Sequence, residues 1–236
     1  INTVPSAIAQ LLRINGIPTS VKAINLAGEA LPHRLVEELE KLSHIETIFN
    51  LYGPSEDTTY STYTSVKSNA DGVVTIGKGI SNTQTYILDR YLNLVPQGVI
   101  GELYLSGAGI TRGYLGRSPL TAEKFLPNPF MEGIYSRLYK TGDLVRYDGE
   151  GNLEFLGRRD NQVKVRGYRL EIGEIEAALS QYPDIIENAV MVWREDNNNQ
   201  RLTAYIVVEE AFSQKQLRRF LGCLLYTSDA ADEQQR

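Results

Sequence analysis

The stretch GRRDNQVKVRGYRLEIGEIE, residues Gly157–Glu176, indicates the fold of this chain more strongly than any other. Short runs of β-forming residues lie on both sides of Gly167, and Ile172 and Ile175 then recur at helical spacing. This pattern predicts two strands followed by a helix, unlike the β-rich sequence before it. We therefore expect a domain boundary near Asp160.

Toward the C-terminus, the pattern predicts a compact α+β unit over residues 160–222. Ala189–Trp193 and Leu202–Val208 read as strands around a polar turn, and Ser213 can cap a last helix. The helical pattern stops at residue 223. The stretch CLLYTSDAADE resembles the translation of a sequencing-library adapter, so we expect residues 223–236 to be non-native.

Toward the N-terminus, the sequence between Val73 and Leu156 is dominated by short β-rich runs separated by Gly, Asn, Asp and Pro. This predicts a twisted sheet or a small barrel, with one helix after Ser118-Pro119. The expected strands are Val73–Ile76, Thr85–Leu88, Glu102–Leu105, Leu144–Tyr147 and Leu153–Leu156.

The first fifty residues predict a parallel α/β unit. Ser6 is expected to cap a helix over Ala7–Ile14, and a second helix should begin at Pro32. Strands are expected at Val21–Asn25 and Ile45–Leu51.

Composition excludes several classes of protein. The chain has 236 residues, with 24 Lys and Arg against 29 Asp and Glu, a net charge of −5 that argues against a nucleic-acid-binding arm. No apolar run approaches the roughly 18 residues of a membrane span. One cysteine and two histidines argue against a disulfide framework or a structural zinc site. The start lacks Met and a signal peptide, so we expect an interior piece of a cytoplasmic protein.

Three tempting motifs are rejected. Gly72–Lys78 has the spacing of a phosphate loop, but Gly79 stands where the magnesium-binding hydroxyl belongs. The glycines from Gly107 onward lack the dinucleotide-binding spacing and no helix opens after them. His33 and His44 lie eleven residues apart, without carboxylates arranged as a ligand set, and are expected on solvated helix surfaces.

Four dense segments remain: NLYGPSE at 50–56, GELYLSGAGITRGYLG at 101–116, YKTGDLVRY at 139–147 and the stretch at 157–176. Singly, each has a structural explanation as a turn, a hairpin or a solvated charged face. In this order and spacing they resemble the adenylation domains of non-ribosomal peptide synthetases, in the adenylate-forming superfamily. The resemblance extends over Ile1–Leu221 and includes INTVPSAI and INLAGEAL.

The resemblance implies an α/β fold. Residues 1–159 would be the C-terminal part of the large AMP-binding core, an α/β sheet plus a β-rich subdomain, and residues 160–222 a truncated small α+β subdomain. It implies a two-step reaction: a carboxylate attacks the α-phosphate of Mg-ATP, giving acyl-AMP and pyrophosphate, and the acyl group passes to the phosphopantetheine thiol of a carrier protein. The implied partners are an amino-acid substrate, a peptidyl carrier domain and a condensation domain of the same megasynthase.

The resemblance also assigns the nucleotide site. Tyr52 and Phe155 would sandwich the adenine, and Asn50 would hydrogen-bond its amino edge. Asp143 would accept hydrogen bonds from both ribose hydroxyls, because a carboxylate offers two acceptor oxygens.

Charged residues are assigned the catalytic roles. Glu56 would help to hold Mg²⁺, a cation that prefers oxygen ligands, and Arg158 would contact the ribose or the phosphates. Asp160 falls at the hinge about which the small domain would rotate between the two half-reactions. Gly167 would let the pantetheine arm pass close to the backbone.

The acyl pocket is implied only in part. Gly28 and Glu29 would border the nucleotide. The aspartate that binds the α-amino group would lie upstream of Ile1, so the acid itself stays open. The matching pocket positions are Ser6, Asn25, Ala27, Leu51, Thr59 and Tyr60.

By the same resemblance, the Ser/Thr/Gly-rich phosphate loop would precede residue 1, and the catalytic lysine would lie near the end of the small domain, beyond the point where the adapter-like tail begins. The chain alone is therefore expected to be inactive. Two alternatives remain: an acyl-CoA ligase of the same superfamily, which usually differs in the 157–176 segment, and a non-catalytic β-rich binding module.

Overall fold

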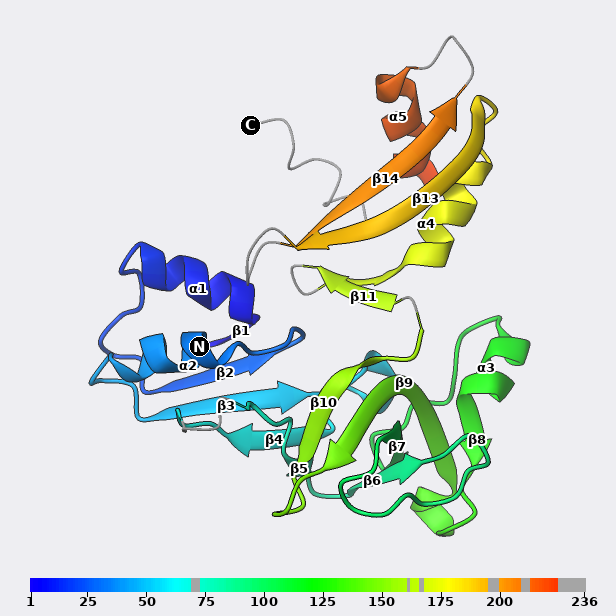
Figure 1. Cartoon of the computed structure of the whole chain (residues 1–236). Coiled ribbons are helices and arrows are strands. Elements are labelled where there is room, and N and C mark those ends of the chain that lie inside the picture. Colours follow the sequence, from blue (N-terminus) through cyan, green and yellow to red (C-terminus); the bar gives the residue numbers. More distant parts are fainter. Residues whose placement is uncertain (69–72, 161, 166–167, 195–199, 209–212, 225–236) are drawn as a thin grey trace. The chain divides into compact units, whose positions relative to one another are not determined.

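The computed structural model describes residues 1–68, 73–160, 162–165, 168–194, 200–208 and 213–224. The chain divides into two compact units, Ile1–Asp160 and Asn161–Arg236. Figure 1 shows the course of the chain within each unit. The mixed α/β architecture predicted from the sequence is confirmed.

The first unit begins with a five-stranded sheet in the order β1-β2-β3-β4-β5. Strands β1, β2 and β3 run parallel, whereas β4 and β5 continue the sheet antiparallel. The predicted parallel α/β unit is therefore confirmed. Its elements are β1 (Asn2–Thr3), α1 (Pro5–Arg13), β2 (Ala23–Ala27), α2 (His33–Glu40), β3 (Thr47–Tyr52), the 3₁₀ turn η1 (Ser55–Asp57), β4 (Thr62–Ser65) and β5 (Lys78–Gly79).

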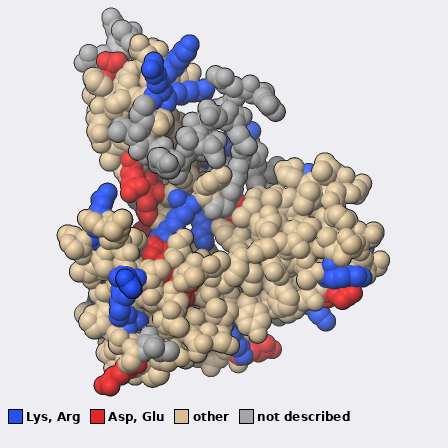
Figure 2. Space-filling model, turned by 180° about the vertical axis from the view of Figure 1, so that it is seen from behind, with Lys and Arg blue, Asp and Glu red and all other residues tan. Residues whose placement is uncertain are grey.

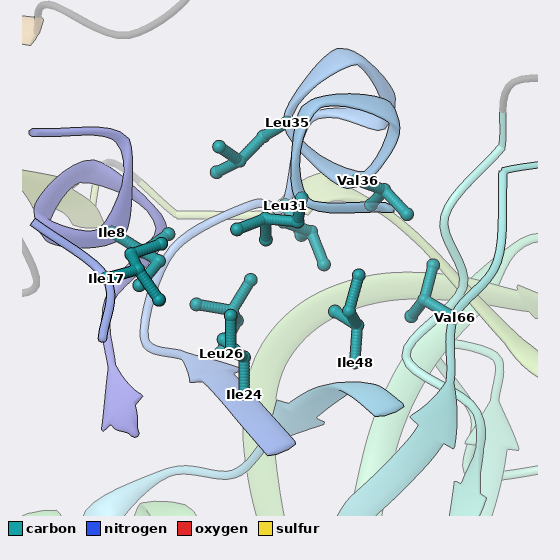
Figure 3. Packing of buried hydrophobic residues seen from close by; sticks show 10 residues of the cluster. Ile8, Ile17, Ile24, Leu26, Leu31, Leu35, Val36, Ile48 and Val66 are labelled. Atoms are coloured by element: carbon teal, nitrogen blue, oxygen red, sulfur yellow. The ribbon is translucent and has the colours of Figure 1, made fainter. Parts of the chain in front are cut away.

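Alternation along β2 and β3 decides which face of this sheet is covered. Ile24, Leu26 and Ile48 are buried and share one face, since side chains two positions apart point the same way. Ile8 of α1 and Leu35 of α2 pack on that face, as Figure 3 shows. Both helices thus bury their apolar stripes on one side of the sheet.

The remainder of the first unit is an antiparallel sheet in the order β10-β9-β7-β6, with β8 paired to β9. Strand β7 is buried along its whole length. The elements are β6 (Thr83–Leu88), β7 (Gly101–Gly107), α3 (Ser118–Lys124), β8 (Phe125–Pro127), the 3₁₀ turn η2 (Gly133–Tyr135), β9 (Arg137–Tyr147) and β10 (Leu153–Arg158). The β-rich character of this region and its one helix are confirmed, whereas β8 and the part of β9 before Leu144 lie outside the predicted strands.

The second unit pairs two hairpins with two helices. Strand β11 pairs with β12 and β13 with β14, all antiparallel. Leu179 and Val190 lie in a core to which the last helix contributes Leu217. The elements are β11 (Gln162–Val165), β12 (Tyr168–Glu171), α4 (Ile172–Ser180), β13 (Ile185–Arg194), β14 (Gln200–Val208) and α5 (Gln214–Leu224). Gly167, assigned above to the pantetheine arm, lies outside the described residues, as does nearly all of the 223–236 segment.

Four local predictions are wrong. His44 lies in a turn after α2 rather than on a helix, and its Nε2 is buried. The cap of α1 is Val4 rather than Ser6, because Pro5 already occupies the first helical position. Val73–Ile76 is not a strand; Ile76 donates a backbone hydrogen bond to the carbonyl of Leu153, and its own carbonyl accepts one from the hydroxyl of Thr62. The last helix runs to Leu224, past the predicted break at residue 223.

The apolarity of the helices and the distribution of surface charge bear on two of the classes considered from the composition. No helix within the described ranges is long and apolar enough to cross a membrane. On the face drawn in Figure 2, the described Lys and Arg side chains are interspersed with Asp and Glu among uncharged residues, without a broad area of one sign.

Candidate functional site

The centre of the site is a hydrogen bond between the end of one strand and the middle of another. Tyr52 is the last residue of β3, and its hydroxyl donates to Oδ2 of Asp143 on β9. Tyr52 is 7% exposed and Asp143 is 5% exposed. Burial, and then the charge of Asp143, raise the pKa of Tyr52 well above its usual range, so the phenol stays a donor.

Arg158 joins this pair from the end of β10. Its Nη1 donates to Oδ1 of Asp143 at 2.6 Å, and Nη2 donates to the carbonyl of Thr141 at 3.0 Å. Its Nε and Nη2 each donate to a carboxylate oxygen of Asp160 at 2.7 Å. Arg158 therefore ties the ribose-binding candidate Asp143 to the hinge candidate Asp160.

A glycine makes room for this arginine. Gly142 has φ +79°, and a Cβ there would lie 2.7 Å from Nη2 of Arg158 and 2.8 Å from Oδ2 of Asp160. Both the backbone conformation and the close approach exclude a larger residue. The sequence Thr141-Gly142-Asp143 is thus suited to its surroundings at each position.

Phe155 lies on the same face of the antiparallel sheet as Asp143. It pairs in register with Val145, two residues beyond Asp143 on β9, so the three side chains share one face. Val145 belongs to the buried cluster that contains Tyr52. Phe155 itself is 37% exposed, which leaves ring surface for a ligand to cover.

Asn50 is buried two residues before Tyr52 on β3. Its Nδ2 donates to the carbonyl of Thr75 at 2.8 Å, which assigns the amide orientation. The side-chain oxygen Oδ1 is then an acceptor, the type of group that an adenine amino group requires.

Glu56 lies in η1, four residues after Tyr52. It is 7% exposed, and Oε1 accepts a hydrogen bond of 2.6 Å from the hydroxyl of Tyr114. Burial and then this hydrogen bond raise the pKa of Tyr114 far above its usual range. A carboxylate offers further acceptor positions beyond one such bond, so its chemistry fits a hard cation. The described residues contain no group of three His, Cys, Asp or Glu side chains placed to bind a metal by themselves.

The predicted acyl-pocket residues lie mostly on the face of the first sheet opposite its helices. Ala27 pairs with Leu51, and Asn25 points to the same side. Asn2 pairs with Asn25, and its side chain exchanges hydrogen bonds of 3.0 and 3.1 Å with the hydroxyl of Tyr60. Tyr60 thereby joins this face. Thr59 precedes it and is exposed.

Ser6 has a different environment. Its backbone N–H and its hydroxyl donate to the two carboxylate oxygens of Glu29, at 2.9 and 3.0 Å. Glu29, predicted to border the nucleotide, therefore satisfies the N-terminus of α1. Gly28 before it has φ +84°, a conformation that glycine adopts without strain.

Sequence reasoning missed three contributors: Tyr114 beside Glu56, Thr141 beside Arg158, and Asn2 beside Tyr60. Asn2 and Tyr60 are 58 residues apart, as are Glu56 and Tyr114. No local spacing predicts such contacts. Tyr114 does lie in the GYLG part of the segment at 101–116, and its place in that segment is the one feature of the sequence that could have indicated it.

Comparison with known proteins points in one direction. A family described as AMP-binding enzyme matches residues 1–115. A linear gramicidin synthase of Brevibacillus parabrevis is 56% identical over 211 residues, which cover 89% of this chain and 4% of that protein. The chain thus spans only a small part of the length of such relatives.

Solved structures agree with the fold. An NRPS protein containing adenylation and PCP domains, bound to a vinylsulfonamide inhibitor, superposes with a TM-score of 0.82 at 29% identity, over 93% of this chain and 39% of that one. The Vibrio cholerae adenylation domain AlmE, in complex with glycyl-adenosine-5'-phosphate, gives a TM-score of 0.84 at 26% identity, over 96% of this chain and 44% of that one.

Proposed function

Because this chain belongs to the AMP-binding enzymes and spans part of an adenylation domain of the non-ribosomal peptide synthetase type, we propose that the complete domain activates an amino acid, or a related carboxylic acid, with ATP. The products are the acyl-AMP and pyrophosphate. The acyl group then passes to the phosphopantetheine thiol of a peptidyl carrier domain, and a condensation domain of the same megasynthase uses it.

The observation that carries this proposal is the meeting of Tyr52, Asp143 and Arg158 beside Phe155. Asp143 accepts one bond on each carboxylate oxygen from these partners, and a carboxylate can accept about four in all. Its two oxygens are the type of acceptor that a pair of ribose hydroxyls requires. The exposed ring of Phe155 on the same face suits a purine.

In the proposed mechanism the protein positions the reactants and stabilises charge. Tyr52, Phe155 and Asn50 bind the adenine, Asp143 orients the ribose, and Arg158 contacts the ribose or phosphates. Glu56 helps to hold Mg²⁺, which neutralises phosphate charge when bound. The face formed by Asn25, Ala27, Leu51, Thr59 and Tyr60 orients the acid.

Comparison also supports the carrier step. The inhibitor-bound NRPS protein contains both adenylation and PCP domains, and we propose that this domain also works with a carrier domain. Asp160, the last residue of the first unit, serves as the hinge between the two half-reactions. We further propose that the 236 residues alone do not adenylate, since the phosphate loop and the catalytic lysine of the family have no counterpart among the matched segments.

The test is amino-acid-dependent ATP–pyrophosphate exchange by the complete adenylation domain, over a panel of the common amino acids. We expect exchange with one acid or a few related acids, abolished by Asp143→Ala and unchanged by Glu46→Ala, which removes an exposed carboxylate. CoA thioester formation in place of carrier loading would favour the acyl-CoA ligase. Unaltered turnover in Asp143→Ala would reject the ribose-binding role of Asp143, and a lack of ATP–pyrophosphate exchange with every acid would favour the binding module.

A further inference from the structure

A strained turn separates the magnesium-binding candidate from the acyl-pocket candidates. Thr58 has φ +68° and ψ −64°, and the N–H of Thr59 donates to the carbonyl of Asp57 at 2.9 Å. This is a γ-turn of the positive-φ form, which is rare and strained. The strain is greater for a β-branched residue, since its Cβ crowds the backbone at positive φ.

The loop that follows β7 holds this turn in place. The Thr58 hydroxyl donates to the carbonyl of Gly109 at 2.8 Å, and the N–H of Thr111 donates to the carbonyl of Glu56 at 2.9 Å. A Cβ on Gly109 would lie 2.3 Å from Oδ1 of Asp57. Three consecutive residues, 56 to 58, are therefore each in contact with residues 109–111.

The neighbours of the turn give it a use. The residue two positions before Thr58 is Glu56, whose carboxylate is buried against Tyr114. The residues after it are Thr59 and Tyr60, and Tyr60 is anchored to Asn2 on the pocket face. Any relaxation of the Thr58 backbone toward ordinary φ values would redirect the chain on both sides.

We propose that Thr58 and Gly109 are positioning residues, which hold the γ-turn strained so that the Glu56 carboxylate and the Thr59–Tyr60 wall of the acyl pocket keep a fixed relation. This inference rests on the function proposed above. Neither residue is catalytic; both act through the residues that flank the turn. The strain persists because the 109–111 loop holds the turn from outside it.

The kinetic test compares Thr58→Val, Thr58→Ser and Gly109→Ala in the complete adenylation domain, with Thr19→Val as the same chemical change at an exposed turn. Valine keeps the shape and loses the hydroxyl. We expect it to raise the KM for the amino acid and the Mg²⁺ concentration for half-maximal exchange by about 2- to 10-fold each, the range of one lost hydrogen bond. Gly109→Ala should do the same, while Thr58→Ser and Thr19→Val stay at wild-type values.

A purely structural role predicts a different pattern: a fall in kcat that follows the active fraction, with both constants unchanged. That pattern, or wild-type constants in Thr58→Val, would overturn the inference.

Hydrogen exchange separates this inference from the proposed function, because it needs no activity. In Thr58→Val the amides of Thr59 and Thr111 should exchange faster than in wild type and Thr58→Ser, without a change in the thermal midpoint. Equal amide protection in wild type, Thr58→Ser and Thr58→Val would refute the positioning role of Thr58, even if the domain is an active enzyme. The wild-type domain could also show no ATP–pyrophosphate exchange with any acid while Thr58→Val still loses amide protection as expected. That result would support the positioning role of Thr58 and Gly109 and reject the proposed function.

Discussion

The hydroxyl of Tyr52 donates a hydrogen bond to Asp143 across 91 residues of sequence. The bond joins the first sheet to the antiparallel sheet, since Tyr52 ends β3 and Asp143 lies in β9. Both side chains are buried, and Asp143 also accepts from Arg158. The hydrogen bond therefore contributes to the stability of the fold and also fixes the position of Asp143 in the candidate site. Substitutions can separate these two contributions.

Tyr52→Phe should lower the free energy of unfolding by about 1–3 kcal/mol, since it deprives a buried carboxylate of one donor. The ring remains, so the KM for ATP should change little. Urea denaturation and ATP–pyrophosphate exchange measure the two effects. Tyr91→Phe, at a ring that is 69% exposed, is the control. A large KM change with unaltered stability would contradict this account.

Arg158→Lys should impair adenylation although it keeps the charge. A lysine has a single ammonium and cannot reproduce the planar fork that reaches Asp143, Asp160 and the carbonyl of Thr141 at once. We expect kcat/KM for ATP to fall about 10- to 100-fold, equivalent to one or two charge-assisted hydrogen bonds.

The neighbouring Arg159→Lys is a matched control for that change. Arg159 makes a 3.0 Å ion pair with Glu102, and its side chain is 56% exposed. A single contact of this kind suits an ammonium as well, so exchange rates should stay within about twofold of wild type. Equal losses in both variants would show that the fork of Arg158 is not what matters.

Alkaline pH should destabilise the protein through its buried tyrosines. Burial, and then the charge of Glu102, raise the pKa of Tyr104 from 10.0 to about 12. The folded state then holds the phenolic proton more tightly than the unfolded state does. This stabilisation is fully present below pH 10.0 and is lost as the pH rises toward about 12.

Tyr104→Phe removes that dependence. Between pH 10.0 and about 12, its unfolding free energy should fall less steeply than that of wild type, by up to about 1.4 kcal/mol per pH unit. Denaturation at several pH values measures the slope. A slope in Tyr104→Phe identical to that of wild type would refute the burial argument.

Ser6 and Glu29 should be energetically coupled. Ser6→Ala removes one of the two bonds to Glu29, and Glu29→Gln removes the charge at the N-terminus of α1. Each single change should cost about 0.5–1.5 kcal/mol, and the double variant less than the sum. A double-mutant cycle by urea denaturation measures the coupling. Additive losses would mean that the contact contributes nothing of its own.

The periodicity of apolar residues predicts most of the strands and helices, because that pattern is contained within each element. Alternation in Thr85–Leu88 and helical spacing after Ile172 predict β6 and α4 directly. Ser6 was mistaken for a cap because its residue type favours that position, whereas Pro5 displaces it into the first turn.

The site was predictable only as a set of residues, not as a network. Motif resemblance singled out Asp143 and Arg158, but their bond forms because β9 and β10 pair in register. The γ-turn at Thr58 could not be predicted, since propensity argues against a β-branched residue at positive φ. The hydroxyl of Thr58 donates to the carbonyl of Gly109, 51 residues away, and no local pattern indicates that contact.

Phe155 offers the most direct test of nucleotide binding, because it can be changed with little effect on the core. It is 37% exposed, whereas its cross-strand partner Val145 is fully buried. Phe155→Ala should raise the KM for ATP about 5- to 150-fold, since stacking of a base on an aromatic ring is worth about 1–3 kcal/mol. Phe155→Tyr and Phe155→Trp keep an aromatic face and should remain near wild type. Leu156→Ala, at the adjacent exposed residue, is the control. Equal KM values for ATP in Phe155→Ala and Leu156→Ala would place the adenine away from this ring. A KM for ATP that rises in Phe155→Ala alone, and stays near wild type in Phe155→Tyr and Phe155→Trp, would locate the adenine on it.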